Sequence, residues 1–227
     1  MYKNTKISLV IPCYNEEAGI DKILKRTPSL FDEVIVVDNA STDRTSEVAR
    51  RLGAKVVFER QKGYGQAYVA GFKVASADII VTMDGDNSYS IEETPKLINY
   101  LINNKLDFIS GCRFPLQQKQ AMSLLNRLGN YILTVFFDIL TFRKIRDSQS
   151  GMWVLKREIL KEMRLKSRGM AFSEEIKMEV ILNRHIKFAE IPINYSERLG
   201  RVKLKKWKDG LINILFLFKK RIEIFLR

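Results

Sequence analysis

The sequence predicts an α/β fold, with a Rossmann-like, mostly parallel β-sheet and helices on both of its faces. Two observations support this prediction. Along the first half of the 227-residue chain, short β-branched runs alternate with segments of helical periodicity, as in repeated strand–helix–strand units. The first of these runs, ISLVI at residues 7–11, is almost wholly apolar, which is typical of a strand buried on both faces.

The expected elements follow one another in a regular order. The helix after the second strand can be capped by Thr42 or Asp43 and ended by Gly53. In chain order we expect strands at residues 7–11, 33–37, 55–58, 78–83 and 108–110, with helices between them at residues 17–25, 43–52, 66–75 and 91–103. Ligands of such sheets bind at the carboxyl ends of the strands.

The second half of the chain has a different pattern. A long helical segment at residues 122–145 carries many large apolar side chains, and a helix at 173–184 and a strand at 188–193 follow it. Residues 198–227 hold ten Lys or Arg against two acidic residues, a net charge of 10 − 2 = +8. The apolar stretch 211–218 (LINILFLF) lies among them, flanked by Lys205, Lys206, Lys208, Lys219, Lys220 and Arg221. We therefore expect a basic amphipathic helix at an anionic membrane surface.

Composition limits the possible classes of protein. The net charge of +13 requires an anionic partner. Two cysteines, Cys13 and Cys112, cannot build a disulfide framework, and the single histidine, His185, excludes a multi-histidine metal site. No apolar run reaches the ~18–20 residues of a transmembrane helix, and the first residues lack a signal-peptide pattern. We expect a cytoplasmic protein, peripheral on the inner face of the membrane. Nucleic-acid binding is the alternative for so basic a chain, but the sequence has no helix-turn-helix, RRM or zinc pattern.

Polar residues follow three of the expected strands and should meet at one edge of the sheet. The sharpest group is Asp84-Gly85-Asp86, after DIIVTM. Two carboxylates this close repel each other unless a cation compensates them, and hard oxygen ligands suit Mg²⁺ or Mn²⁺ bridged to phosphate. A solvated Asp-Gly turn is the alternative. Asp38 ends the second strand and could accept hydrogen bonds from a ribose or a base, because neighbouring residues are available to cap the next helix; its alternative role is that cap itself.

Residues 62–67 (KGYGQA) form a glycine-rich loop that leads into a helix. Glycines allow a close backbone approach, and the helix N-terminus favours an anion or a hydroxyl-rich ligand. A plain turn explains the same residues equally well.

Taken together, these motifs resemble family 2 glycosyltransferases of the GT-A fold. The opening ISLVIPCYNEE (7–17) and VVDNASTDRT (36–45) are similar to that family's strand-end motifs, and Asp84-Gly85-Asp86 resembles its DxD metal motif. GYGQAYVAGF (63–72), DSQSG (147–151) and RLGRVKL (198–204) resemble one branch, the dolichyl-phosphate mannose synthase-like polyprenyl-phosphate glycosyltransferases. The resemblance covers roughly residues 5–205, in order and at the usual spacings.

The resemblance implies a role for each matching residue in the donor site. The residues implied in nucleotide-sugar binding are Pro12, Tyr14 and Glu16 around the nucleoside, Asp38 at the base or ribose, Gln66 near the ribose, and Asp84. Asp84 and Asp86 would hold Mg²⁺ or Mn²⁺ against the diphosphate. Some positions depart from the pattern: Asn39-Ala40 replace Asp-Gly, Asn87-Ser88-Tyr89 replace the LQH of mannose synthases, and Ala171 replaces an acidic residue.

The implied reaction moves a sugar, with inversion if displacement is direct, from a nucleotide-sugar to a polyprenyl or dolichyl phosphate. Such a phosphate is already ionised near neutrality, so cations that bind it matter more than a strong base. The candidate cations are Arg113, Arg127, Arg198 and Lys203. Asp147 could orient the sugar or donor, act as a base, or form a structural turn. Glu175 is a second candidate base, with helix capping as its alternative.

We expect a glycosyltransferase domain at residues 1–205, with a nucleotide-binding half to about residue 112 and an acceptor half after it, and the membrane-associated helix at 206–227. A GT-A enzyme with a soluble or glycan acceptor shares the nucleotide pocket but needs a true base and no basic apolar tail. A nucleotidyltransferase would carry an early GxGxR loop, and none is found in the sequence. Close variants of the pattern carry mannose, glucose or N-acetyl sugars on GDP or UDP, so both nucleotides remain candidates, as do dolichyl and undecaprenyl acceptors and every oligomeric state.

Overall fold

The computed structural model describes residues 5–200 and 206–226, with side chains from Gly210 onward in the last helix. Its strands form one seven-stranded sheet in the order β3-β2-β1-β4-β6-β5-β7. The strands are β1 (Ile7–Cys13), β2 (Glu33–Asp38), β3 (Lys55–Phe58), β4 (Ile79–Thr82), β5 (Phe108–Cys112), β6 (Trp153–Lys156) and β7 (Phe188–Pro192). The α-helices are α1 (Glu17–Arg26), α2 (Thr45–Arg51), α3 (Tyr64–Val74), α4 (Thr94–Asn103), α5 (Leu124–Thr141), α6 (Phe172–Leu182) and α7 (Lys206–Phe225).

The sheet is mostly parallel, as predicted. β1 pairs in parallel with β2 and β4, and β2 with β3, so the first four strands end at one edge. β6 runs antiparallel between β4 and β5, while β7 is parallel to β5. The sequence pattern did not predict β6, whose four residues, WVLK, are too few to show a period.

Helices cover both faces of the sheet, and successive strand residues pack on opposite sides. Leu9 and Ile11 lie in a buried cluster with residues of α1, α2 and α4, whereas Val10 lies in a second cluster with residues of α3 and α6. This division follows from the two-residue period of a strand. It confirms the expected α/β architecture with helices on both faces.

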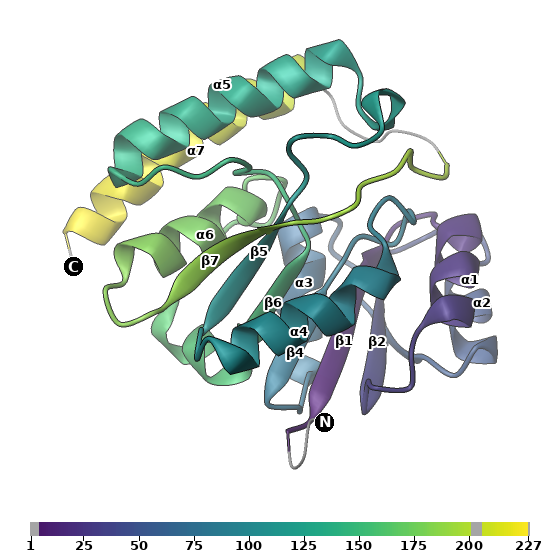
Figure 1. The fold of residues 1–227 in the computed structure, drawn as a ribbon. Coiled ribbons are helices and arrows are strands. Elements are labelled where there is room, and N and C mark those ends of the chain that lie inside the picture. The colour runs from purple at the N-terminus through teal and green to yellow at the C-terminus, as the bar shows by residue number, and fades with distance from the viewer. Residues whose placement is uncertain (1–4, 201–205, 227) are drawn as a thin grey trace.

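The long apolar helix is shorter than its predicted range of 122–145. α5 starts after Ser123, whose side chain accepts a hydrogen bond from the Asn126 N–H, and it ends where Phe142 adopts a left-handed conformation with φ of 54°. Figure 1 shows α5 and α7 lying side by side. Both pack against α6, at one end of the molecule. A small buried cluster of Phe137, Ile145, Met178 and Leu217 joins α5, α6 and α7.

Candidate active site

The ends of β1 and β2 are tied to each other, as the sequence predicted for one functional edge. The Asn15 N–H donates to Ser41 Oγ at 2.9 Å, and Asn15 Oδ1 accepts from the Thr42 N–H at 2.7 Å. The Glu16 N–H donates to Thr45 Oγ1 at 2.9 Å. These contacts fix the direction of the chain after β1.

Arg198 brings three distant segments together at this edge. Its guanidinium lies 3.0 Å from Glu16 Oε1 and 3.5 Å from Asp86 Oδ2. Asp86 is buried, and its Oδ1 accepts from the Ser88 N–H at 2.9 Å and the Ser88 hydroxyl at 2.6 Å. Ser88, one of the departures from the mannose synthase pattern, therefore orients the second carboxylate of the DxD triplet.

The first carboxylate of the triplet is held by two tyrosines. Asp84 Oδ1 accepts hydrogen bonds from the hydroxyls of Tyr64 at 3.0 Å and Tyr68 at 3.3 Å. Burial and the nearby charge of Asp86 raise the pKa of Asp84 to about 7, although Tyr64 and Arg113 oppose that rise. The two carboxylates thus form a crowded anionic pair whose charge a cation would relieve. Within the described residues, no group of three or more His, Cys, Asp or Glu side chains could hold a metal ion. A divalent ion at Asp84 and Asp86 would accordingly complete its shell with substrate oxygens and water.

Asp38 does not cap the next helix, because α2 begins after Arg44 and has no side-chain cap, but the Asp38 carboxylate is engaged by other partners. Its Oδ1 accepts from the Ser41 N–H at 2.9 Å, its Oδ2 accepts from the Ser46 hydroxyl, and the residue is buried. The neighbouring Asn39, a departure from the family pattern, binds the carbonyl oxygens of Glu59 and Gln61 and accepts from the Gly63 N–H. Both side chains thus shape the rim of the site, and contact with a base or ribose remains a prediction for Asp38.

The glycine-rich loop packs against another segment of this chain, at residues 168–169. The N–H groups of Gly65 and Gln66 donate to the carbonyl oxygens of Gly169 and Arg168, at 3.2 and 3.1 Å. A Cβ atom on Gly63 would collide with the Arg168 carbonyl oxygen. The predicted anion site at the start of α3 is therefore wrong for these two N–H groups, which are already used.

Gln66 and Tyr14 nevertheless offer polar groups to a ligand. Gln66 Oε1 is buried and has no hydrogen-bond partner among the described residues. The Tyr14 hydroxyl accepts from Lys62 Nζ at 2.8 Å, and that ammonium lies 4.3 Å from the centre of the Tyr14 ring. Pro12 is buried within β1, opposite Val37 of β2.

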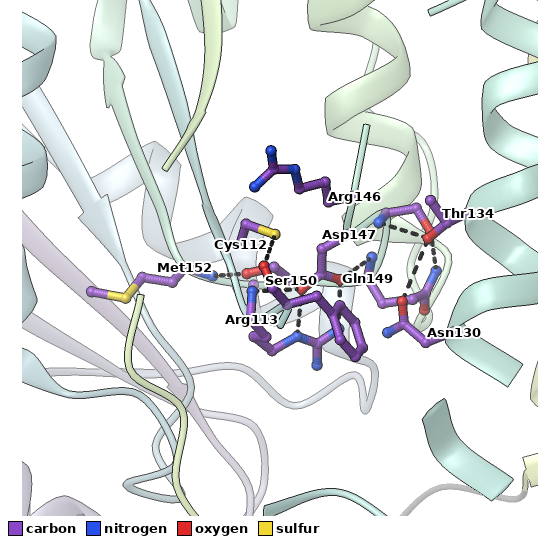
Figure 2. Close-up of polar contacts among 12 residues, drawn as sticks. Cys112, Arg113, Asn130, Thr134, Arg146, Asp147, Gln149, Ser150 and Met152 are labelled. Atoms are coloured by element: carbon purple, nitrogen blue, oxygen red, sulfur yellow. Dashed lines mark hydrogen bonds and ion pairs between the residues drawn. The ribbon is translucent and has the colours of Figure 1, made fainter. Parts of the chain in front are cut away.

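Arg113 and Asp147 form a buried, two-pronged ion pair beside this edge (Figure 2). The Arg113 Nε and Nη2 atoms lie 2.7 and 2.8 Å from the two carboxylate oxygens, and the Arg113 backbone N–H donates to Oδ2 at 3.0 Å. Burial alone would raise the pKa of Asp147, but Arg113 holds it down at about 2. The Arg113 guanidinium also packs 5.3 Å from the centre of the Tyr195 ring.

The backbone of Asp147 is held by two charged residues that the sequence did not single out, the half-buried Glu190 and the buried Lys177. Glu190 accepts from the Asp147 N–H at 3.1 Å and from the Arg146 N–H at 2.7 Å. Lys177 Nζ donates to the Asp147 carbonyl oxygen at 2.6 Å. With its carboxylate on Arg113 and its backbone held on both sides, Asp147 positions Arg113, and this geometry argues against its predicted role as a base.

The turn after Asp147 is fastened to the apolar helix α5. Thr134 Oγ1 donates to Ser148 Oγ at 3.0 Å and accepts from the Ser148 N–H at 3.1 Å. Asn130 Oδ1, one turn earlier on α5, lies 3.5 Å from the Thr134 hydroxyl. The DSQSG element is therefore attached to α5 on one side and to Arg113 on the other.

Three predicted site residues remain: Glu175, Arg127 and Lys203. Glu175 is buried, and its carboxylate accepts from the Lys166 and Ser167 N–H groups and pairs with Lys220. None of these partners is a backbone N–H of α6, which has no side-chain cap, so the capping alternative is wrong, and the role of Glu175 as a base stays a prediction. Arg127 is half-buried on α5, and Lys203 lies outside the described residues.

Comparison with known proteins assigns the family. Residues 8–164, more than half of the chain, match the profile of glycosyl transferase family 2. A dolichyl-phosphate hexose transferase of Haloferax volcanii is 33% identical over 212 residues, which cover 92% of this chain and 91% of that protein. A dolichol-phosphate mannosyltransferase of Pyrococcus furiosus is 30% identical over 220 residues, covering 88% of this chain.

Two further comparisons bear on length and fold. This chain matches 52% of the length of the low-salt glycan biosynthesis hexosyltransferase Agl6 of Haloferax volcanii and 59% of that of the Pyrococcus protein. The crystal structure of glucosyl-3-phosphoglycerate synthase from Mycobacterium tuberculosis with Mn²⁺, uridine diphosphate and glucosyl-3-phosphoglycerate superimposes with a TM-score of 0.75. The two chains are 21% identical, and the match covers 97% of this chain and 81% of that one. This likeness supports the GT-A fold. The chain is therefore a glycosyltransferase that belongs to glycosyl transferase family 2.

Proposed function

We propose that this protein transfers a sugar from a nucleotide-sugar to a polyprenyl phosphate, with inversion and with Mg²⁺ or Mn²⁺ bound at Asp84 and Asp86. One observation carries the acceptor assignment: Asp147 is fully engaged in holding Arg113. A hydroxyl acceptor needs a base to take its proton, whereas a phosphate monoester is ionised near neutrality because its second pKa is about 6. The relatives named as dolichyl-phosphate transferases support the same acceptor class.

The donor half of the proposal uses the residues at the carboxyl ends of β1, β2 and β4. Tyr14 and Glu16 would border the nucleoside, and the unpartnered Gln66 Oε1 would accept from a ribose hydroxyl. Asp84 and Asp86 would hold the divalent ion, which would neutralise the diphosphate and stabilise it as a leaving group. Arg198 already compensates Asp86 and Glu16 and would be displaced toward phosphate when an ion is bound.

The acceptor half uses Arg113 as the fixed cation. A bidentate partner such as Asp147 holds a guanidinium in one orientation, and the charge of Arg113 reaches Asp84, whose pKa it lowers. Arg113 would therefore bind the acceptor phosphate close to the donor's diphosphate. Arg127, Arg198 and Lys203 are proposed as further phosphate-binding cations.

Exposed apolar side chains on α5 and α7 support a membrane location. We call them the apolar platform: Leu124, Leu125, Leu128, Tyr131, Ile132, Val135 and Ile139 from α5 with Phe142 just after it, and Leu211, Ile212, Leu215, Phe218, Ile222 and Phe225 from α7 with Leu226 just after it. So large an exposed apolar set is rare on a monomeric protein and marks an interaction surface. Among the described helices, none has the length and hydrophobicity to cross a membrane. We propose that the platform lies in the membrane interface, as amphipathic helices do.

Transfer to a lipid phosphate tests the proposal. Labelled UDP- and GDP-sugars are incubated with Mn²⁺ and vesicles that contain polyprenyl phosphate, and the lipid product is quantified. We expect product from one nucleotide class, its loss with EDTA and in Asp86→Ala, and a large decrease in Arg113→Gln. Arg143→Gln, an exposed arginine just after α5, is the matched control. Transfer that is unchanged in Arg113→Gln would overturn the acceptor assignment.

A further inference from the structure

Lys220 is a buried lysine on the helix that carries half of the apolar platform. Its side chain is 1% exposed, whereas its neighbour Lys219 is exposed. Lys220 Nζ lies 2.6 Å from Glu179 Oε1 and 3.0 Å from Glu175 Oε1, and it donates to the Arg164 carbonyl oxygen at 2.6 Å. The expectation that Lys220 faces anionic lipid is therefore wrong, because its charge is directed inward to α6.

Glu175 connects Lys220 to the segment before α6, residues 164–169. Its carboxylate accepts from the Lys166 N–H at 3.0 Å and from the Ser167 N–H at 2.8 Å. Together with the Lys220 bond to Arg164, three backbone groups between residues 164 and 167 are fastened to this one buried ion pair. Breaking a buried ion pair by removing one partner leaves an uncompensated charge, so the attachment is costly to release.

The opposite side of the same segment supports the start of α3. The carbonyl oxygens of Arg168 and Gly169 accept from the Gln66 and Gly65 N–H groups. A Cβ atom on Gly65 would collide with the Ser167 carbonyl oxygen, so the two backbones touch directly. The glycines of the GYG sequence are thus explained by this backbone contact.

The start of α3 in turn positions the donor-site groups. Tyr64 donates to Asp84 Oδ1 at 3.0 Å, and the buried Gln66 Oε1 is unpartnered among the described residues. An unbroken series of contacts therefore leads from Lys220 on α7 through Glu175 and residues 164–169 to Tyr64 and Asp84.

We propose that Lys220 is a positioning residue of the nucleotide-sugar site: by pairing with Glu175 it fixes the 164–169 segment that holds Tyr64 and Gln66 in place. The identity of the ligand rests on the proposed function, but the mechanical link does not. The C-terminal helix is accordingly a structural part of the donor site as well as a membrane-facing element.

Hydrogen exchange and nucleotide binding of Lys220→Met, with Lys219→Met as the matched control, test this inference. In Lys220→Met we expect the amides of residues 65–66 and 166–167 to exchange about tenfold faster, while amides in β1 keep their protection, because only a local unit is released. Affinity for UDP or GDP with Mn²⁺ should fall about tenfold. Lys220→Arg, which keeps the charge, should retain part of the amide protection and part of the nucleotide affinity. Lys219→Met should change neither quantity.

A measurement on the unaltered protein covers the case in which Lys220→Met does not fold. In native-state hydrogen exchange with increasing denaturant, the amides of residues 65–66, 166–167 and 217–220 should open as one unit with a common free energy. Opening of residues 65–66 independently of 166–167 and α7, or normal protection of residues 65–66 in a folded Lys220→Met, would overturn the inference. Because exchange is measured without nucleotide, its result stands even if the unaltered protein binds no UDP or GDP, an outcome that would count against the proposed function alone.

Discussion

Arg113 and Asp147 hold each other through two parallel contacts of 2.7 and 2.8 Å at the end of β5, near enough to the DxD triplet for the charge of Arg113 to lower the pKa of Asp84. The arginine is the fixed cation of the site, and the aspartate is its support. Three other features converge on the aspartate: Glu190, Lys177 and the turn that Thr134 attaches to α5. This arrangement suits recognition of a phosphate by Arg113. It does not suit Asp147 to act as a base, because its carboxylate is held by Arg113.

Removing the charge of Asp147 should disable catalysis through Arg113. For Asp147→Asn we expect kcat to fall about 100-fold, since a displacement of about 1 Å at a positioned group can cost that much. Donor binding, measured by calorimetry with UDP or GDP and Mn²⁺, should change little. Asp107→Asn, which removes an ion pair with Lys156 just before β5, is the control and should retain activity. A loss of donor affinity equal to the loss of kcat would contradict the separation of the two roles.

The same ion pair gives a defined dependence of stability on acid. The pKa of Asp147 is about 2 in the folded protein, below its ordinary value of 3.8. A carboxyl group with a lowered folded pKa stabilises the protein fully above the unfolded pKa, and this contribution is lost as pH falls toward the folded pKa. We expect a contribution of about 2 kcal/mol above pH 4 that disappears between pH 4 and pH 2. Urea unfolding of the unaltered protein and Asp147→Asn across this range measures it; parallel curves for the two proteins would contradict it.

Glu174 should give the opposite dependence at higher pH. It is buried, its carboxylate oxygens have no hydrogen-bond partner among the described residues, and burial raises its pKa to about 8 although the charge of Lys177 opposes this rise. Because the folded state keeps the proton that the unfolded state releases, stability should fall as pH rises from about 4.5 to 8. Glu174→Gln should make this slope shallower, since Asp84, whose pKa is also raised, accounts for part of it, and should raise the melting temperature at pH 8. An unchanged slope between pH 5 and pH 8 in Glu174→Gln would refute the assignment.

The tyrosine at the start of α3 should tune metal affinity. Tyr64→Phe removes the hydroxyl that donates to Asp84 Oδ1. Loss of a hydrogen bond to a metal-binding carboxylate typically costs 10–100-fold in metal affinity, and we expect about tenfold for Mn²⁺ with nucleotide present. The control is Tyr100→Phe on α4, which removes the same hydroxyl group at a distance from the site and should leave Mn²⁺ affinity unchanged. Equal Mn²⁺ affinity in Tyr64→Phe and the unaltered protein would exclude this role.

Membrane affinity should depend on the apolar platform and not on exposed apolar residues in general. Leu215 on α7 is 62% exposed, and Tyr100 on α4 is 42% exposed. Burying a leucine contributes about 1.5–3 kcal/mol, so Leu215→Glu should weaken binding to anionic vesicles by roughly tenfold or more. Tyr100→Glu should leave vesicle binding unchanged in a sedimentation assay. Equal loss in both variants would show that net charge, and not the platform, determines binding.

Much of the fold could be predicted because its signals are local. Apolar runs, helix stops such as Gly53 and the strand-end motifs of β1, β2 and β4 specified the order of elements and their convergence at one edge. β6 could not be predicted, because its pairing partners β4 and β5 lie far away in sequence. The predicted range of α5 was too long at both ends, because the helix starts after the Ser123 cap and ends at the left-handed conformation of Phe142.

The site was predictable where a motif named a residue and unpredictable where burial decided its role. Motifs named Asp86 and Arg198, which meet at 3.5 Å. In contrast, nothing local indicated that Asp147 would be enclosed by Lys177 and Glu190. A buried lysine on a helix has the same letter as a solvated one, and only the packed neighbours distinguish Lys177 or Lys220 from an exposed charge. The glycines of the GYG sequence pointed to a close approach, but the sequence could not say that the partner was the backbone of residues 167–169.

The most direct test compares two acceptors that differ only in the phosphate. Transfer from the active nucleotide-sugar is measured in the presence of Mn²⁺, with vesicles that carry either a polyprenyl phosphate or the corresponding polyprenol. The account predicts transfer to the phosphate alone, with a rate that rises as the phosphate gains its second negative charge near pH 6 and then stays level to pH 8. Transfer to the polyprenol at a comparable rate would contradict it, because that reaction needs a base that Asp147, held by Arg113, does not supply.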